Sequence, residues 1–142
     1  MDVVGTWIRA SLVDQQGNTL WGITASANQR TPENAESVEI RVGRVARNAL
    51  QRAEWHVIVG LGLAVAGPLD PATGVMFGPP NLPELDGVSL KSNLQDSFDI
   101  SVTAGNNANL ATMAGFTYGA GGQAPVLVYL TISTGIGRRN HH

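Results

Sequence analysis

The most informative absence in this chain of 142 residues is cysteine, because the sequence contains none. Without a thiol the chain forms no disulfide, performs no thiol catalysis and offers no cysteine ligand to zinc. No apolar run reaches the roughly 18 residues of a membrane span, and no basic N-terminus with an apolar stretch indicates a signal peptide. We therefore expect a cytoplasmic protein without a membrane partner.

Charged residues are also few, at 14%, and the net charge is -2. The arginines lie mostly on one predicted helix and form no basic stripe, so we do not expect a nucleic-acid partner. Hydrophobic residues make up 43% of the chain, which is enough for the core of one globular domain. The sequence ends in GRRNHH, residues 137–142, which we interpret as a truncated or artefactual tail and not as a metal site.

The first half of the chain is predicted to contain a hairpin, a helix and a central strand. Residues 3–14 favour a strand, residues 15–18 a turn and residues 19–25 the partner strand. Since only Met1 precedes Asp2, we expect that the native start of the first strand is missing and that this end frays. Thr31-Pro32-Glu33 predicts the start of an amphipathic helix that continues to Ala53. Residues 57–65 are apolar without alternation, which predicts a strand covered on both faces.

The second half alternates between short strands and helices. We expect strands over residues 75–77, 100–103 and 126–132, the last of them buried, and a turn over 133–137. Ser89 is predicted to cap a short helix. Apolar residues at helical spacing follow Asn106 and Asn107, which places these two amides at a helix N-terminus. The alternation of elements predicts an α/β fold with a mixed sheet.

Three turns rich in glycine and asparagine each follow a predicted buried strand. They occupy residues 60–81 (GLGLAVAGPLDPATGVMFGPPN), 104–109 (AGNNAN) and 130–137 (LTISTGIG). Strand ends of open α/β sheets are where backbone amides and short polar side chains meet small polar ligands, so the layout predicts a ligand cleft. Each turn taken alone also has a structural explanation. Glycine permits a turn after a buried strand in any α/β fold, and Asn106 can cap a helix without binding a ligand.

Taken in order, these segments resemble the N-terminal lobe of the ROK family of repressors, uncharacterised reading frames and sugar kinases. Asp2-Val3-Val4-Gly5-Thr6 is similar to the family's first phosphate turn, and residues 60–81 are similar to its GxGxxxPGPxD segment and asparagine-leucine pair. Residues 106–109 resemble its NDAN motif and residues 131–137 its second phosphate turn. The resemblance implies a ribonuclease-H-like (actin-like ATPase) lobe with a mixed sheet, an N-terminal β-hairpin and flanking helices. It also implies that residues 1–120 form the N-terminal lobe and residues 121–142 begin the second lobe.

The resemblance implies an ATP-dependent, glucokinase-like transferase of carbohydrate metabolism, acting on a hexose or an amino sugar with Mg²⁺ at the phosphates. By position, the residues that would meet sugar hydroxyls are Gly67, Asn81, Asn106 and Asn107. Those that would face the ATP phosphates are Asp2, Gly5, Thr6, Thr134 and Gly135, and Asp2 would hold magnesium through water. Neutral amides suit such a sugar site, because they donate to and accept from vicinal hydroxyls without burying a charge.

The sequence departs from the family pattern in three ways. Asn107 stands where the family has the aspartate that takes the proton from the sugar hydroxyl, and Val4 stands where it has a glycine beside the phosphates. The second lobe, with its adenine pocket and zinc site, is absent. We therefore expect a chain that is inactive by itself and that self-associates through exposed apolar surface. Two alternatives stay open: a non-catalytic sugar-binding sensor and a gene remnant without function.

Overall fold

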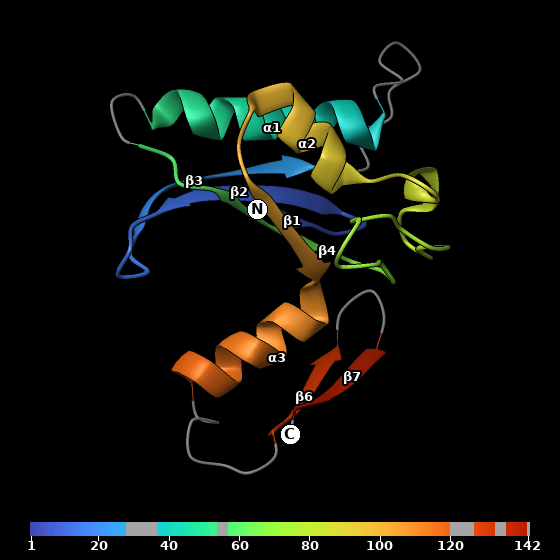
Figure 1. Ribbon diagram of the computed structural model, residues 1–142. Coiled ribbons are helices and arrows are strands. Elements are labelled where there is room, and N and C mark those ends of the chain that lie inside the picture. Colours follow the sequence, from blue (N-terminus) through green and yellow to red (C-terminus); the bar gives the residue numbers. More distant parts are fainter. Residues whose placement is uncertain (28–36, 54–56, 120–126, 133–135, 142) are drawn as a thin grey trace.

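The computed structural model in Figure 1 describes residues 1–27, 37–53, 57–119, 127–132 and 136–141. Its main element is a five-stranded sheet of order β3-β2-β1-β4-β5. Strand β1 pairs antiparallel with β2 and parallel with β4, so the sheet is mixed, as predicted. The strands are β1 (Asp2–Val3), β2 (Trp7–Val13), β3 (Thr19–Ser26), β4 (Leu61–Val65) and β5 (Val102–Asn106).

The predicted hairpin is present, but residues 3–14 do not form one strand. The N–H of Val4 donates to the carbonyl of Trp7 over 3.0 Å, so the chain reverses at residues 4–6 and separates β1 from β2. In β2 the side chains of Ile8 and Ala10 are buried under a helix, whereas those of Arg9 and its odd-numbered neighbours are exposed. The sequence does not reveal this short turn at Gly5, because the valine and threonine on either side of the glycine favour a strand.

The predicted turn between β2 and β3 is confirmed and depends on Asp14. Its carboxylate accepts hydrogen bonds from the backbone N–H groups of Gln16, at 2.9 Å, and of Asn18, at 2.8 Å. The side-chain amide of Asn18 donates to it as well, and these bonds lower the pKa of Asp14, because they stabilise the charged carboxylate. Gly17 has φ +86°, the left-handed conformation that glycine adopts without strain.

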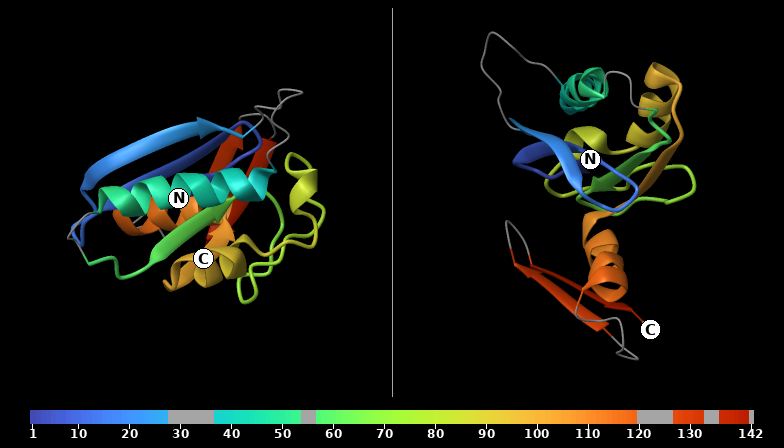
Figure 2. Two further views of the ribbon diagram at one scale, coloured as in Figure 1. Left: turned by 90° about the horizontal axis from the view of Figure 1, so that it is seen from above. Right: turned by 90° about the vertical axis from the view of Figure 1, so that its left-hand side faces the viewer.

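Helices α1 (Val38–Arg52) and α2 (Leu90–Phe98) cover one face of the sheet (Figures 1 and 2). Helix α1 begins later than predicted, because its N-cap is Ser37, whose hydroxyl accepts from the N–H of Ile40. Residues 31–33 lie outside the described residues. The predicted cap of α2 by Ser89 is confirmed by a 3.1 Å bond from the N–H of Ser92. The two helices bury the core residues Val38, Val42, Val45, Ala46, Ala49, Leu90 and Leu94.

Strand β4 is shorter than predicted and is covered on one face only. It spans Leu61–Val65, with Leu63 and Val65 buried and Gly62 exposed, while Val57 and Val59 are 87% and 84% exposed. The sequence misleads here because glycine and alanine on the open face look apolar without filling a core. The strand predicted over 100–103 is also shifted, since β5 spans residues 102–106. The strand predicted over 75–77 is reduced to isolated bridges at Val75 and Met76.

Helix α3 (Asn107–Tyr118) follows β5 directly and lies on the opposite side of the sheet from α1 and α2 (Figures 1 and 2). It contacts a separate two-stranded sheet of β6 (Leu127–Ile132) and β7 (Ile136–His141). The prediction of a buried strand is wrong for Val128 and Leu130, which are 49% and 64% exposed. The supposed tail pairs with β6 as β7, and residues 133–135 of the predicted turn are outside the described residues. No described helix is long and apolar enough to cross a membrane.

Candidate functional site

The carboxyl ends of β1, β4 and β5 meet at one edge of the sheet. Val3 of β1 pairs with Val65 of β4, and Val65 pairs with Asn106 of β5, so the three parallel strands end level with one another. The turns that follow them, residues 4–6, residues 66–68 and the start of α3, therefore lie together. The carboxyl ends of the strands are where ligands bind in open α/β sheets.

Asn106 connects two of these turns. Its side-chain Nδ2 donates to the carbonyl of Gly67 over 2.8 Å, and its Oδ1 accepts from the N–H groups of Ala108 and Asn109 at 3.1 and 3.2 Å. Asn106 is thus the N-cap of α3, which confirms the helix start. Its oxygen already accepts two bonds and one amide hydrogen is donated, so the second amide hydrogen is the polar capacity that remains.

The loop that ends at Asn81 packs against the other two turns. A Cβ built on Gly5 would lie 2.9 Å from the Cβ of Asn81, and one built on Gly67 would lie 2.7 Å from the Cβ of Pro79. Neither site has room for a side chain, so both glycines are required by close approach. The structure therefore brings together the predicted residues Gly5, Gly67, Asn81, Asn106 and Asn107, which we call the amide cluster.

The two outer amides of the amide cluster are accessible. Asn81 is exposed, and Asn107 is half-buried at the first position of α3, where its Oδ1 lies 2.9 Å from the N–H of Ala108. Thr6 is exposed beside Gly5 at the end of the first turn. Thr134 and Gly135, predicted at the second phosphate turn, lie outside the described residues.

Asp70, the aspartate of the GPxD segment, holds its own turn. Its carboxylate accepts from the N–H of Ala72 at 3.0 Å and from the hydroxyl of Thr73 at 2.8 Å. The hydrogen bond from Ala72 has the larger effect and that from Thr73 the next, and both lower the pKa of Asp70, because they stabilise the charged form. Asp70 therefore shapes the loop that leads to Asn81.

Asp2 is paired with an arginine that the sequence analysis did not single out. The Asp2 carboxylate accepts from Arg9 Nε over 3.1 Å and forms a salt bridge with Arg9 Nη2. Arg9 lies directly opposite Asp2 in the β1·β2 pairing. The cross-strand register of this hairpin is the signal by which the ion pair could have been predicted.

This pair bears on the predicted magnesium site. A guanidinium cation at the carboxylate competes with a divalent ion, so Asp2 in this arrangement does not fit a magnesium site. Within the described part of the chain, no three His, Asp or Glu side chains gather as a metal site would require.

Comparison with known proteins gives the family. The model of the ROK family matches residues 1–138. The chain belongs to the ROK family. A glucokinase from Aeropyrum pernix is 31% identical over 138 residues, which are 96% of this chain and 41% of that protein. A xylose repressor from Bacillus subtilis is 26% identical over 138 residues, which are 35% of its length.

Solved structures of the ROK family show the same fold. The structure of a ROK glucokinase from Streptomyces griseus in complex with glucose and AMPPNP superposes with a TM-score of 0.79. It is 23% identical to this chain, and the match covers 96% of this chain and 41% of that one. The predicted ribonuclease-H-like (actin-like ATPase) architecture is confirmed. The chain spans less than half the length of the curated relatives that it matches.

The bond between Asn106 and Gly67 makes a testable contribution to stability. Asn106→Asp keeps the oxygen that caps α3 but loses the amide hydrogen that Gly67 accepts. We expect it to lower the free energy of unfolding by about 1–3 kcal/mol, because the Gly67 carbonyl then faces a carboxylate. Urea denaturation measures this loss. Asn109→Asp, at an exposed neighbour, is the matched control and should change stability by less than about 0.5 kcal/mol. Equal stability of the two variants would contradict a role for this bond.

Proposed function

We propose that this chain is the N-terminal part of a ROK-type sugar kinase and that its amide cluster binds the hydroxyls of a hexose or an amino sugar. The observation that carries the proposal is the convergence of Gly67, Asn81, Asn106 and Asn107 at one sheet edge. The glucose and AMPPNP in the Streptomyces griseus structure support sugar and nucleotide as the ligand classes. In this proposal residues 1–120 form the sugar-binding lobe, residues 121–142 begin the second lobe, and the protein works in the cytoplasm.

The chemistry of the cluster suits a polyol. Asn81 and Asn107 keep accessible amides, each of which can donate two hydrogen bonds. The Asn107 oxygen already accepts from the N–H of Ala108 and can accept one bond more. A site built from such groups discriminates by hydroxyl pattern, because a missing hydroxyl leaves a buried amide unpaired. The ATP phosphates would be met by Asp2, Gly5 and Thr6 together with Thr134 and Gly135.

We further propose that the chain by itself transfers no phosphate. Asn107 cannot take the proton from a sugar hydroxyl, because a neutral carboxamide is not a base at physiological pH. The Arg9 side chain pairs with Asp2, the residue that the family resemblance assigns to magnesium. The residues given span less than half of the relatives' length, so they supply only part of a site that would close over the reactants. Self-association through exposed apolar residues of the lobe belongs to the same proposal.

Calorimetric titration tests the sugar site. We expect at least one of glucose, mannose, N-acetylglucosamine and N-acetylmannosamine to bind with a millimolar Kd, about -4 kcal/mol, because half a site supplies few contacts. Asn81→Ala should weaken binding about tenfold through the loss of one well-placed hydrogen bond. This variant keeps the Cβ that Gly5 contacts, so the loop stays packed. Asn93→Ala on α2 is the control and should leave the Kd unchanged.

Two specific observations favour a second candidate, a sugar sensor that binds without catalysis. These are Asn107 at the position of the base and the pairing of Arg9 with Asp2. Titrations with and without magnesium and ATP separate the candidates. Sugar binding that nucleotide leaves unchanged supports the sensor, whereas coupled binding supports the kinase part. If none of the four sugars binds, both candidates fail and a gene remnant without function is the surviving explanation.

A further inference from the structure

Strand β3 forms one edge of the five-stranded sheet (Figures 1 and 2). It pairs with β2 along one side, and no strand of the described residues pairs with it along the other. Its sequence, TLWGITAS, contains no charged residue and no proline. Natural proteins often protect an exposed edge with such residues, because its row of unpaired backbone groups pairs readily with another strand. A β-bulge with Leu20 as the extra residue interrupts the start of β3, so the regular part of the edge begins at Trp21.

The backbone groups of every second residue of β3 point to the open edge. The N–H of Ala27 donates to the carbonyl of Thr6 over 2.8 Å, and this bond continues the ladder between β2 and β3. In an antiparallel ladder the bonded pairs alternate along the strands, so the odd-numbered residues of β3 bond toward β2. The N–H and carbonyl groups of Gly22 and Thr24, which are both exposed, are therefore turned outward.

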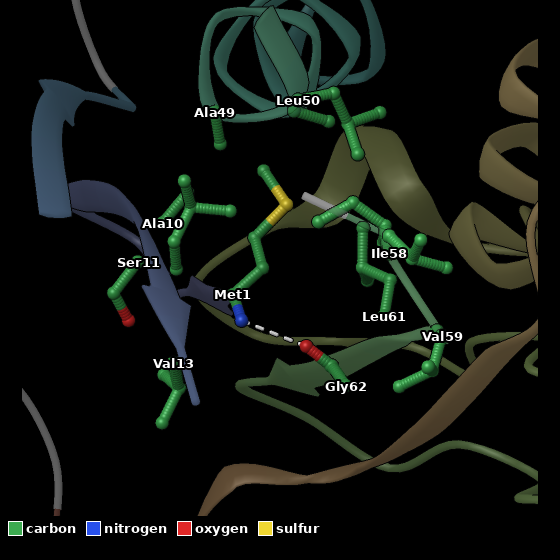
Figure 3. A pocket seen from close by; sticks show the side chains of 14 residues that line it. Met1, Ala10, Ser11, Val13, Ala49, Leu50, Ile58, Val59, Leu61 and Gly62 are labelled. Carbon is green, nitrogen blue, oxygen red and sulfur yellow. Dashed lines mark hydrogen bonds between the residues drawn. The ribbon is translucent and has the colours of Figure 1, made fainter. Parts of the chain in front are cut away.

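The apolar side chains on the α1 side of β3 are not fully buried. Figure 3 shows the alternation of side chains on the neighbouring β2, where Ala10 lies toward α1 and Ser11 away from it. Because residues directly opposite each other share a face, Ile23, which pairs with Ala10, also lies on the α1 side. Ile23 and its same-face neighbours Trp21 and Ala25 pack against the core but stay half-buried. A strand added at this edge would cover them further.

We propose that the edge of β3 is a dimerisation site, at which a second copy of this chain pairs antiparallel with the first. The regular part of the edge, from Trp21 to Ala27, has Thr24 at its centre, so a two-fold axis there places Thr24 opposite itself. Ile23 of each copy then lies opposite Ala25 of the other, a large side chain against a small one. No like charges meet, because β3 has none.

This self-matching favours a second copy over a different partner, and the two five-stranded sheets join into one continuous sheet. The dimer gives a surface to the self-association proposed above and rests on that proposal. The sugar site is independent of it, because β3 contains no residue of the amide cluster.

Sedimentation equilibrium of three proteins tests this site. We expect the wild-type chain to form a dimer with a Kd of about 10–100 μM, because pairing one strand buries an area at the small end of specific interfaces. Thr24→Lys should raise this Kd at least about fivefold, since two lysines would then lie opposite each other. Thr103→Lys is the matched control, at an exposed position of β5 on the other edge of the sheet, and should leave the Kd unchanged.

The outcomes separate this proposal from the others. A chain that stays monomeric well above that concentration range would show that self-association itself is absent. A dimer that Thr24→Lys leaves intact, or that Thr103→Lys weakens equally, would place the interface elsewhere. Either result overturns the proposal. Titration of the Thr24→Lys protein with sugar should give the same Kd as the wild-type chain, because Thr24 lies outside the amide cluster.

Disulfide cross-linking provides a second measurement that does not depend on the effect of an added charge. The chain has no cysteine, so a single one can be introduced. Thr24→Cys places two Cα atoms about 5.5 Å apart across the two-fold axis, within the range that a disulfide spans. Thr103→Cys is again the matched control. We expect at least about tenfold more disulfide-linked dimer from Thr24→Cys on non-reducing electrophoresis, and comparable yields would overturn the proposal.

Discussion

Replacing Asn107 by aspartate is expected to raise sugar phosphorylation by at least tenfold in a chimera that supplies the second lobe. In that chimera this chain replaces the matched 138 residues of the Aeropyrum pernix glucokinase. A general base that accepts the hydroxyl proton typically contributes about 10² to 10⁴ in rate, and the carboxamide of Asn107 contributes none of it. Val4 and the Arg9–Asp2 pair are retained, so we expect the gain at the lower end of that range.

The position of Asn107 favours an ionised carboxylate. Its Oδ1 accepts from the N–H of Ala108 over 2.9 Å at the N-terminus of α3, where this N–H and the helix dipole stabilise negative charge. The substitution should therefore supply a base at neutral pH without destabilising the fold. Asn109→Asp is the matched control, since it adds the same charge at an exposed site two residues away. A gain of less than tenfold for Asn107→Asp, or an equal gain in the control, would show that the interpretation of this position is wrong.

Gly67→Ala is expected to lower the free energy of unfolding by about 2–4 kcal/mol, the largest stability effect of the substitutions considered. Gly67 has φ +138°, a conformation that residues with a Cβ rarely adopt. The new Cβ would lie 2.7 Å from the Cβ of Pro79 and 3.0 Å from Cε of Met76. The proline ring belongs to the loop that positions Asn81, so relief of this overlap would separate the parts of the amide cluster.

Gly62→Ala is the matched control for Gly67→Ala. Gly62 is in the same part of the chain, within β4, and a Cβ there would meet nothing within 4 Å. We expect this variant to remain within about 1 kcal/mol of the wild-type protein. Urea denaturation of both variants decides the comparison. Equal stability would contradict the claim that close packing of the Gly67 turn against Pro79 holds the site together.

Much of the local structure followed from the sequence. The Asp14 turn, the Ser89 cap and the start of α3 at Asn106 were predictable, because each depends on a side chain that bonds to backbone within a few residues. The start of α1 was not predicted correctly. The proline and the acidic residue at positions 31–33 are a stronger helix-start signal in the sequence than the single hydroxyl of Ser37. The prediction for β4 was four residues too long at its start, because a run of apolar residues does not show where pairing with the neighbouring strands begins.

The sequence by itself determined the chemistry available to this protein: an alternating α/β chain, the carboxamides of Asn81, Asn106 and Asn107, and an asparagine where the family resemblance implies a base. Only the tertiary structure decided how those groups are used. It commits Asn106 to holding Gly67 and sets Arg9 against Asp2. The physical reason is that these two features depend on pairing between residues that sheet register brings together, whereas composition and spacing describe each segment alone.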